Sequence, residues 1–165
     1  MTLVRATRTV ATAIVAVSAV LCQPALAADC SAIEAIAAAQ PGGFESIKGE
    51  TRKVGLMTYT YLLTVSPDIA GFANQDCRIR PYSGTVEMSC TATLENEDAL
   101  ARAFETAATD IDRCLVRKDS SVTSVVKRSI TYAAPGAGDS DFYLETQRTN
   151  GGGLQLYFKM TKVGR

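Results

Sequence analysis

The spacing of apolar residues along the chain predicts two helices. An Ala- and Ile-rich segment predicts the first helix from Ser31 to Gln40, and Pro41-Gly42-Gly43 ends it. A second helix is predicted from Glu97 to Leu115, with Asn96 as its N-cap. Its apolar stripe recurs at helical spacing and consists of Leu100, Ala103, Phe104, Ala107, Ile111, Cys114 and Leu115.

Elsewhere the apolar residues alternate with polar ones, which predicts strands. The segments concerned are about Val54–Val65, the hairpin Cys77–Leu94, Val122–Ala133, Phe142–Thr149 and Leu154–Val163. The element order is therefore α-βββ-α-βββ, and it repeats in the two halves without a residue-level repeat. We expect one α+β domain in which both helices pack on one face of a mostly antiparallel sheet.

The first hairpin has a register that can be counted outward from its turn. If Ser83-Gly84 is the two-residue loop, Tyr82 pairs with Thr85 and Cys77 faces Cys90 at a non-hydrogen-bonded pair. Pro81 then removes no hydrogen bond from this ladder. We therefore predict a Cys77–Cys90 disulfide. Cys30 and Cys114 are partners by elimination, and their bond would close a long loop.

The last hairpin is set by the parity of its apolar residues. Phe142 and Leu144 share a face with the apolar residues of the last strand only if Phe142 opposes Met160 and Leu144 opposes Phe158. This register makes Asn150–Gly152 the loop. It also gathers four residues on the face away from the core, beside which Thr58, Thr60 and Thr64 are expected. We interpret this patch as a tentative binding surface, against the alternative of an ordinary solvated sheet face; its members are Tyr143, Glu145, Tyr157 and Lys159.

The first residues predict export. Arg5 and Arg8 precede an apolar run from Val10 to Leu21, and Ala25-Leu26-Ala27 supplies the small residues that a signal peptidase recognises. We expect residues 1–27 to be a Sec-type signal cleaved after Ala27, and residues 28–165 to form one domain. The run is too short to span a bilayer. The protein is thus expected in the periplasm or the medium, where disulfides persist.

Histidine is absent from the sequence, which removes the commonest general base and the Ser-His and Cys-His pairs. Ser124-Val125-Val126-Lys127 matches an S-x-x-K pattern, but a strand there would point its Ser and Lys to opposite faces. Asp139, Asp141 and Glu145 lack the spacing of a calcium loop. Cys22 is expected to leave with the signal, and the four remaining cysteines match no common zinc pattern. We predict no catalytic, metal-binding or cofactor-binding residue.

Charge and hydropathy narrow the choice of partners. The 17 basic and 17 acidic residues are interspersed, so no basic stripe points to nucleic acid, and no apolar stretch after the signal could cross a membrane. We favour an exported, non-catalytic binding or accessory protein of a bacterial envelope, of the inhibitor, immunity or assembly-factor type, whose partner is another envelope or secreted protein. Two alternatives stay open: a carboxylate-dependent hydrolase, and an oligomeric structural component.

Overall fold

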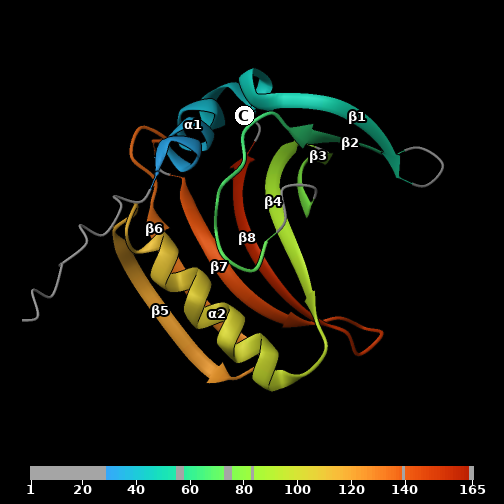
Figure 1. Cartoon of the computed structure of the whole chain (residues 1–165). Coiled ribbons are helices and arrows are strands. Elements are labelled where there is room, and N and C mark those ends of the chain that lie inside the picture. Colours follow the sequence, from blue (N-terminus) through green and yellow to red (C-terminus); the bar gives the residue numbers. More distant parts are fainter. Residues whose placement is uncertain (1–28, 55–57, 73–75, 83, 139, 164–165) are drawn as a thin grey trace, which may run out of the picture.

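The structure is a computed structural model that describes residues 29–54, 58–72, 76–82, 84–138 and 140–163. Eight strands form an antiparallel sheet within these residues, and two α-helices accompany it (Figure 1). The predicted signal and its cleavage site lie outside the described residues. In the described part of the chain, no helix is both long enough and apolar enough to cross a membrane.

The two halves of the chain have the same order of elements. The first half comprises α1 (Ser31–Ala39), two short 3-10 helices, η1 (Gln40–Gly42) and η2 (Glu45–Ile47), and then the strands β1 (Lys48–Val54), β2 (Thr58–Leu63), β3 (Cys77–Tyr82) and β4 (Thr85–Leu94). The second half comprises α2 (Glu97–Ile111), β5 (Arg117–Ser124), β6 (Lys127–Ala133), β7 (Asp141–Arg148) and β8 (Leu154–Val163).

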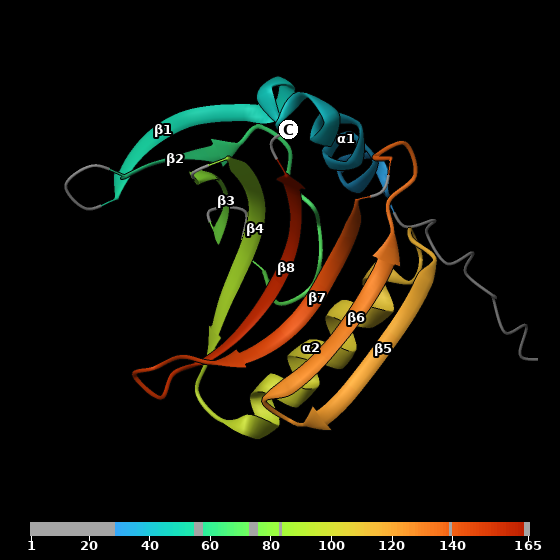
Figure 2. The ribbon, with the colours of Figure 1, turned by 180° about the vertical axis from the view of Figure 1, so that it is seen from behind.

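The sheet joins these halves through their last strands. Its strand order is β1-β2-β3-β4-β8-β7-β6-β5, so each half is an antiparallel meander and β4 pairs with β8 at the centre (Figures 1 and 2). Every residue of β4 has a partner in β8, from Thr85 opposite Val163 to Leu94 opposite Leu154. The β1–β2 and β5–β6 hairpins therefore form the two ends of the sheet.

The expected three strands per half are wrong, because each half has four. The strand predicted from Val54 to Val65 is β2 alone, preceded by β1, and the strand predicted from Val122 to Ala133 is the hairpin of β5 and β6. Both missed strands lie at the sheet edges. All residues of β5 are exposed, as are Glu50–Val54 of β1. Since neither strand buries a face, neither has the apolar alternation that predicts strands.

The two hairpin registers are confirmed. Tyr82 pairs with Thr85 and Cys77 with Cys90 in the first hairpin. In the second, Phe142 opposes Met160 and Leu144 opposes Phe158, and Thr149 donates its N–H to Gly153, which closes the three-residue loop. The rings of Phe142 and Phe158 stack with centroids 5.0 Å apart. These registers fix which residues face the core.

One face of the sheet, which we call the inner face, carries the buried apolar residues of the strands. The helix α2 contacts β4, β7 and β8 and lies on the viewer's side of the sheet in Figure 1. Its buried residues belong to one apolar core together with residues of α1 and the sheet, including Ile36, Met88, Leu144 and Phe158. Seen from behind, the opposite side of β6–β8 is turned to the viewer, with α2 beyond it (Figure 2). We call this opposite side the outer face.

Both predicted disulfides are present. Cys77–Cys90 links neighbouring strands, and Cys30–Cys114 links the start of α1 to the segment after α2, with α-carbons 5.4 Å apart. The second helix was expected to reach Leu115, but it ends at Ile111. The Cys114 N–H then bonds the Ile111 carbonyl at 2.9 Å in a tighter turn. The turn redirects the chain so that Cys114 reaches Cys30 and β5 can begin at Arg117.

The two disulfides should contribute unequally to stability. Cys30–Cys114 spans 84 residues and Cys77–Cys90 spans 13; in the chain-entropy model these loops are worth about 4–5 and about 3 kcal/mol. We expect the double variant C30A/C114A to lose more free energy of unfolding than C77A/C90A in urea titrations. Equal losses, or the reverse order, would show that loop length does not govern the effect.

Candidate functional site

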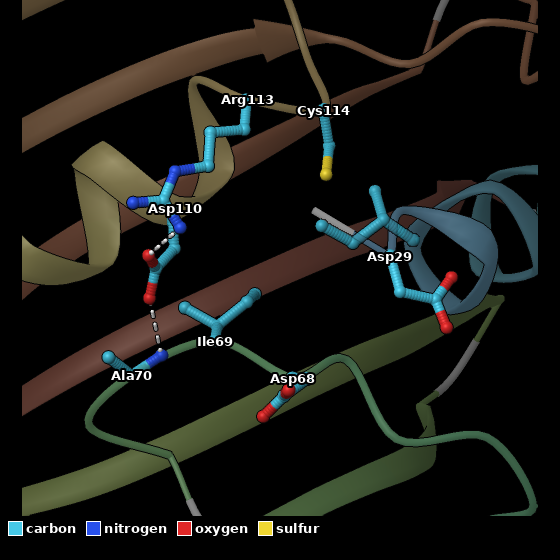
Figure 3. Close-up of a pocket in the computed structure, with 8 residues that line it drawn as sticks. Asp29, Asp68, Ile69, Ala70, Asp110, Arg113 and Cys114 are labelled. Atoms are coloured by element: carbon cyan, nitrogen blue, oxygen red, sulfur yellow. Dashed lines mark hydrogen bonds and ion pairs between the residues drawn. The ribbon is translucent and has the colours of Figure 1, made fainter. Parts of the chain in front are cut away.

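A small hollow lies between the start of α1, the end of α2 and the loop after β2. It is lined by three carboxylates, Asp29, Asp68 and Asp110, and by Arg113 and Cys114 among others (Figure 3). The Asp110 carboxylate accepts the N–H of Ala70 at 3.0 Å and pairs with Arg113 at 3.1 Å. It therefore holds the loop to the end of α2.

The arrangement of this hollow does not favour acid–base chemistry. Figure 3 shows the three carboxylates apart around the hollow, so they do not converge on one point. Hydrogen bonds from Ser31 lower the pKa of Asp29, whereas a carboxylic general acid needs a raised pKa. The carboxylates thus do not form the pair that the hydrolase alternative requires.

The candidate calcium ligands are placed differently. Asp139 lies outside the described residues, Asp141 pairs with Lys118 at 2.9 Å, and Glu145 pairs with Lys159 at 2.6 Å. Both described carboxylates thus have a basic partner. In the described part of the chain, no group of His, Cys, Asp and Glu side chains could hold a metal ion.

The expectation for the S-x-x-K pattern is wrong in its geometry. Ser124 and Lys127 are directly opposite each other across the β5–β6 turn and so share a face. A continuous strand would have separated them, but the chain reverses at Val125 and Val126. Both residues are exposed, and they lack the buried setting in which a lysine activates a serine.

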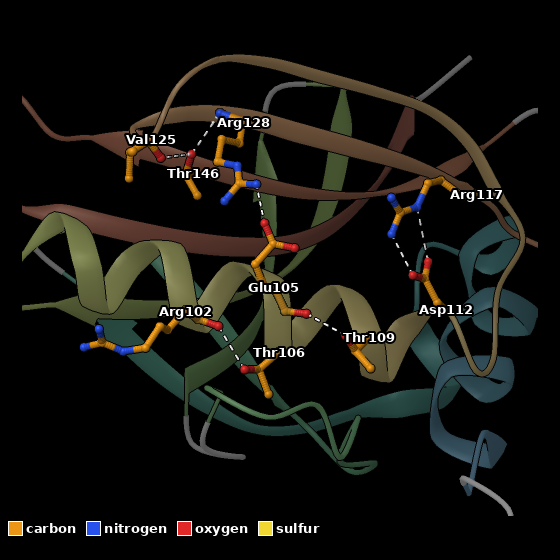
Figure 4. Close-up of polar contacts among 9 residues, drawn as sticks. All are labelled: Arg102, Glu105, Thr106, Thr109, Asp112, Arg117, Val125, Arg128 and Thr146. Atoms are coloured by element: carbon orange, nitrogen blue, oxygen red, sulfur yellow. Dashed lines mark hydrogen bonds and ion pairs between the residues drawn. The ribbon is translucent and has the colours of Figure 1, made fainter.

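Polar contacts fasten α2 to the sheet (Figure 4). The Arg128 guanidinium of β6 pairs with Glu105 of α2 and lies 4.5 Å from the centre of the Phe104 ring. The backbone N–H of Arg128 also donates a hydrogen bond to the Thr146 hydroxyl at 2.9 Å. This hydroxyl in turn donates to the Val125 carbonyl at 3.1 Å. The cluster joins α2, β6, β7 and the β5–β6 turn, which indicates a structural role.

A second contact lies at the end of α2. Asp112 accepts two hydrogen bonds from Arg117, at 2.6 and 3.3 Å (Figure 4). Tyr132 is the cross-strand partner of Arg117, and its side chain is fully buried. Burial, with the nearby Asp112 carboxylate, raises the pKa of Tyr132 to about 12. The Tyr132 phenol is thus held in its neutral form by packing.

The outer face brings together the four residues of the tentative binding surface. Tyr143 opposes Lys159 and Glu145 opposes Tyr157 in the β7–β8 ladder, and the Lys159 ammonium pairs with the Glu145 carboxylate. All four side chains are partly exposed. The sequence thus predicts their placement. Of the threonines expected beside this surface, Thr60 of β2 is the cross-strand partner of Arg52 of β1.

The outer face also carries a group of arginines that the sequence analysis missed. A row runs across five strands through Leu62, Arg78, Ser89, Lys159 and Tyr143. Arg52 and Arg80 belong to the same face one step along. Burial, then the charges of Arg52 and Arg80, lower the pKa of Arg78, although Asp76 acts in the opposite sense. The Arg-x-Arg spacing at 78 and 80 was the available signal, because alternate residues of a strand share a face.

Comparisons with protein families, with characterised proteins and with solved structures give no significant match to the chain. The functional argument therefore rests on the residues of this fold alone.

The raised pKa of Tyr132 predicts a loss of stability at high pH. Because the folded state keeps the phenol protonated up to about 12, against an ordinary value of 10.0, it binds more protons than the unfolded state between these values, and stability falls as pH rises through this window. We expect the free energy of unfolding to fall more steeply above pH 10 in the wild type than in Tyr132→Phe. Parallel profiles of the two proteins would contradict the assignment.

The Arg128 cluster predicts a contrast between its two charged members. Arg128 has a side chain only 17% exposed, whereas that of Glu105 is 64% exposed. We expect Arg128→Ala to cost about 2 kcal/mol, through lost packing and ring contact, and Glu105→Gln about 0.5 kcal/mol or less. Urea unfolding measures both, with Arg102→Ala as the exposed control on α2. Equal losses for Arg128→Ala and Glu105→Gln would refute the packing argument.

Proposed function

We propose that this chain is an exported, non-catalytic protein that binds another envelope or secreted protein through the outer face of its sheet. The observation that carries the proposal is the row of partly exposed aromatic and charged side chains across β7 and β8, on the side away from α2. Tyr side chains offer large contact area with a hydrogen-bonding end, which suits protein interfaces. Tyr143 and Tyr157 are the anchors of this proposed surface, and the Glu145–Lys159 pair lies between them.

The compartment and the packing agree with this proposal. Two disulfides are consistent with a protein outside the cytoplasm, where the expected removal of residues 1–27 would leave it. The proposal places both helices on the inner face, which is supported by the single core that residues of α1 and α2 share with the sheet. Such packing leaves the outer face to a partner.

The test is capture of a partner by a defined surface. The disulfide-bonded protein is mildly crosslinked in envelope and culture-fluid fractions of the organism that makes it, and bound proteins are identified by mass spectrometry. We expect one stoichiometric protein, whose purified form binds the wild type at least tenfold more tightly than Y143A/Y157A. Removal of two central aromatic anchors has this scale of effect in protein interfaces.

A matched control is Tyr59→Ala, because Tyr59 is half-exposed on the other side of β2. It should bind the partner like the wild type. Glu145→Lys is a second variant that keeps both aromatic rings. It replaces the Glu145–Lys159 ion pair by two positive charges on the surface proposed to face the partner. A partner that binds all variants equally would remove the outer face from the proposal, and the absence of any partner would refute the binding role.

A further inference from the structure

The loop of the last hairpin carries an asparagine followed by a glycine. It lies between β7 and β8 and projects beyond the end of the sheet in both views (Figures 1 and 2). Asn150 and Gly151 are both exposed within it. An Asn-Gly sequence suits a tight turn, but it also places a side-chain amide next to a backbone nitrogen that no side chain of its own residue shields. The pair can therefore react as well as form the turn.

The hydrogen bonds of the loop do not involve the reacting atoms of this pair. The Thr149 carbonyl accepts the N–H of Gly152 at 2.9 Å, and the Thr149 N–H donates to the Gly153 carbonyl at 2.8 Å. The Thr149 hydroxyl accepts the N–H of Gly153 at 3.0 Å. In the described part of the chain, neither the Asn150 side-chain amide nor the Gly151 N–H has a hydrogen-bond partner. The turn is thus closed around Asn150 by bonds that leave it out.

The backbone at this point can change its conformation. Gly152 lies in the left-handed region, with a φ of 84°, as the last residue of a three-residue hairpin loop often does. Gly151 lies outside that region, and a β-carbon built on it would meet only the Thr149 hydroxyl, at 4.0 Å. Three successive glycines restrict the chain little, because each of them reaches a wide range of φ and ψ. The Gly151 nitrogen can therefore approach the Asn150 side chain by a local movement of the loop.

Asn96 has the opposite surroundings. As the N-cap of α2, its side-chain oxygen accepts the N–H of Ala99 at 2.8 Å, and this bond holds the side chain in place. The residue that follows is Glu97, which has a side chain and is the first residue of the helix. The third asparagine of the sequence, Asn74, lies outside the described residues. Of the two described asparagines, Asn150 alone has an unbonded side chain beside an unshielded nitrogen.

We propose that Asn150 is a site of spontaneous deamidation in the folded protein. The Gly151 nitrogen gives its proton to water or hydroxide and forms a bond to Cγ of Asn150. The bond from Cγ to Nδ2 then breaks, and Nδ2 takes up a proton and leaves as ammonia. Water opens the resulting succinimide at either of its two carbonyl carbons, which gives aspartate or isoaspartate. The net reaction consumes a water molecule and releases ammonia, without oxidation or reduction.

The product changes the charge and the length of the loop. Aspartate and isoaspartate both add a carboxylate near Arg148, whose guanidinium already pairs with Glu97 at 2.6 Å and reaches the Gly152 carbonyl at 3.5 Å. Isoaspartate also takes the β-carbon of residue 150 into the main chain. Because the bonds from Thr149 to Gly152 and Gly153 close across residue 150, a longer path between them should weaken these bonds. The modification is thus expected to loosen the turn.

The test follows the folded, disulfide-bonded protein over time in mildly alkaline buffer. Samples are digested at acidic pH, and the peptide that contains residue 150 is analysed by mass spectrometry with fragmentation that distinguishes aspartate from isoaspartate. We expect replacement of NH₂ by OH at Asn150, with more isoaspartate than aspartate, and a much slower change at Asn96. The rate should rise with pH, because the attacking nitrogen must lose its proton. The Thr149 amide should lose protection from hydrogen exchange as isoaspartate accumulates.

Two variants separate this mechanism from general decay of the protein. Gly151→Ala keeps Asn150 and fits the space beside Thr149, but its methyl group hinders the attack, so the rate should fall several-fold. Asn150→Asp carries the charge of the product without the additional chain atom, and its Thr149 amide should stay protected. The wild type unfolded in urea gives the rate of the same sequence without the folded turn.

Each other outcome overturns the proposal. An Asn150 that stays unchanged in the folded protein contradicts it outright, and deamidation in urea alone would show that the turn protects the side chain. Equal rates in the wild type and Gly151→Ala, or aspartate as the sole product, exclude attack by the Gly151 nitrogen. Deamidation at Asn96 as fast as at Asn150 removes the structural contrast between the two. None of these results concerns the outer face, so the proposed function is tested separately.

Discussion

The pairing of β4 with β8 is the interaction on which the rest of the structure depends. It joins two meanders that are otherwise separate in sequence, and it does so over the whole length of both strands. Met88, Cys90 and Ala92 on β4 meet Met160, Phe158 and Leu156 on β8 in the core, so the same ladder that joins the halves also aligns their apolar residues. A shift of one residue in either strand would turn the apolar side chains of that strand away from the core.

The sequence predicts the centre of this sheet much better than its edges. Apolar alternation and turn residues were sufficient for the β3–β4 and β7–β8 registers, and through them for the Cys77–Cys90 bond. The edge strands gave no such signal, because β5 is exposed along its whole length and β1 along most of it. The turn at Val125 and Val126 consists of β-branched residues, which favour strands and not turns. Periodicity detects burial, and these segments have little of it.

The sequence likewise predicts one part of the candidate site and not the other. The neighbourhood of Tyr143, Glu145, Tyr157 and Lys159 followed from one correct register, because cross-strand pairing is a local property of a hairpin. The row of residues from Leu62 to Tyr143 did not follow, because it depends on which strand lies beside β4 across the sheet. Only the non-sequential β4–β8 pairing places Ser89 next to Lys159, and only β1, the strand without a periodic signal, adds Arg52.

The two halves share an order of elements but not a surface. On the outer face, β1 and β3 carry Arg52, Arg78 and Arg80, whereas β7 carries Asp141 and Glu145, each matched by a lysine. Burial is the main cause that lowers the pKa of Arg78; the charges of Arg52 and Arg80 act in the same direction, and that of Asp76 acts against them. Glu87 of β4 lies opposite Arg80, so the first half also has a carboxylate on this face. The repeated topology therefore builds one continuous sheet, and its two halves carry different side chains on the same face.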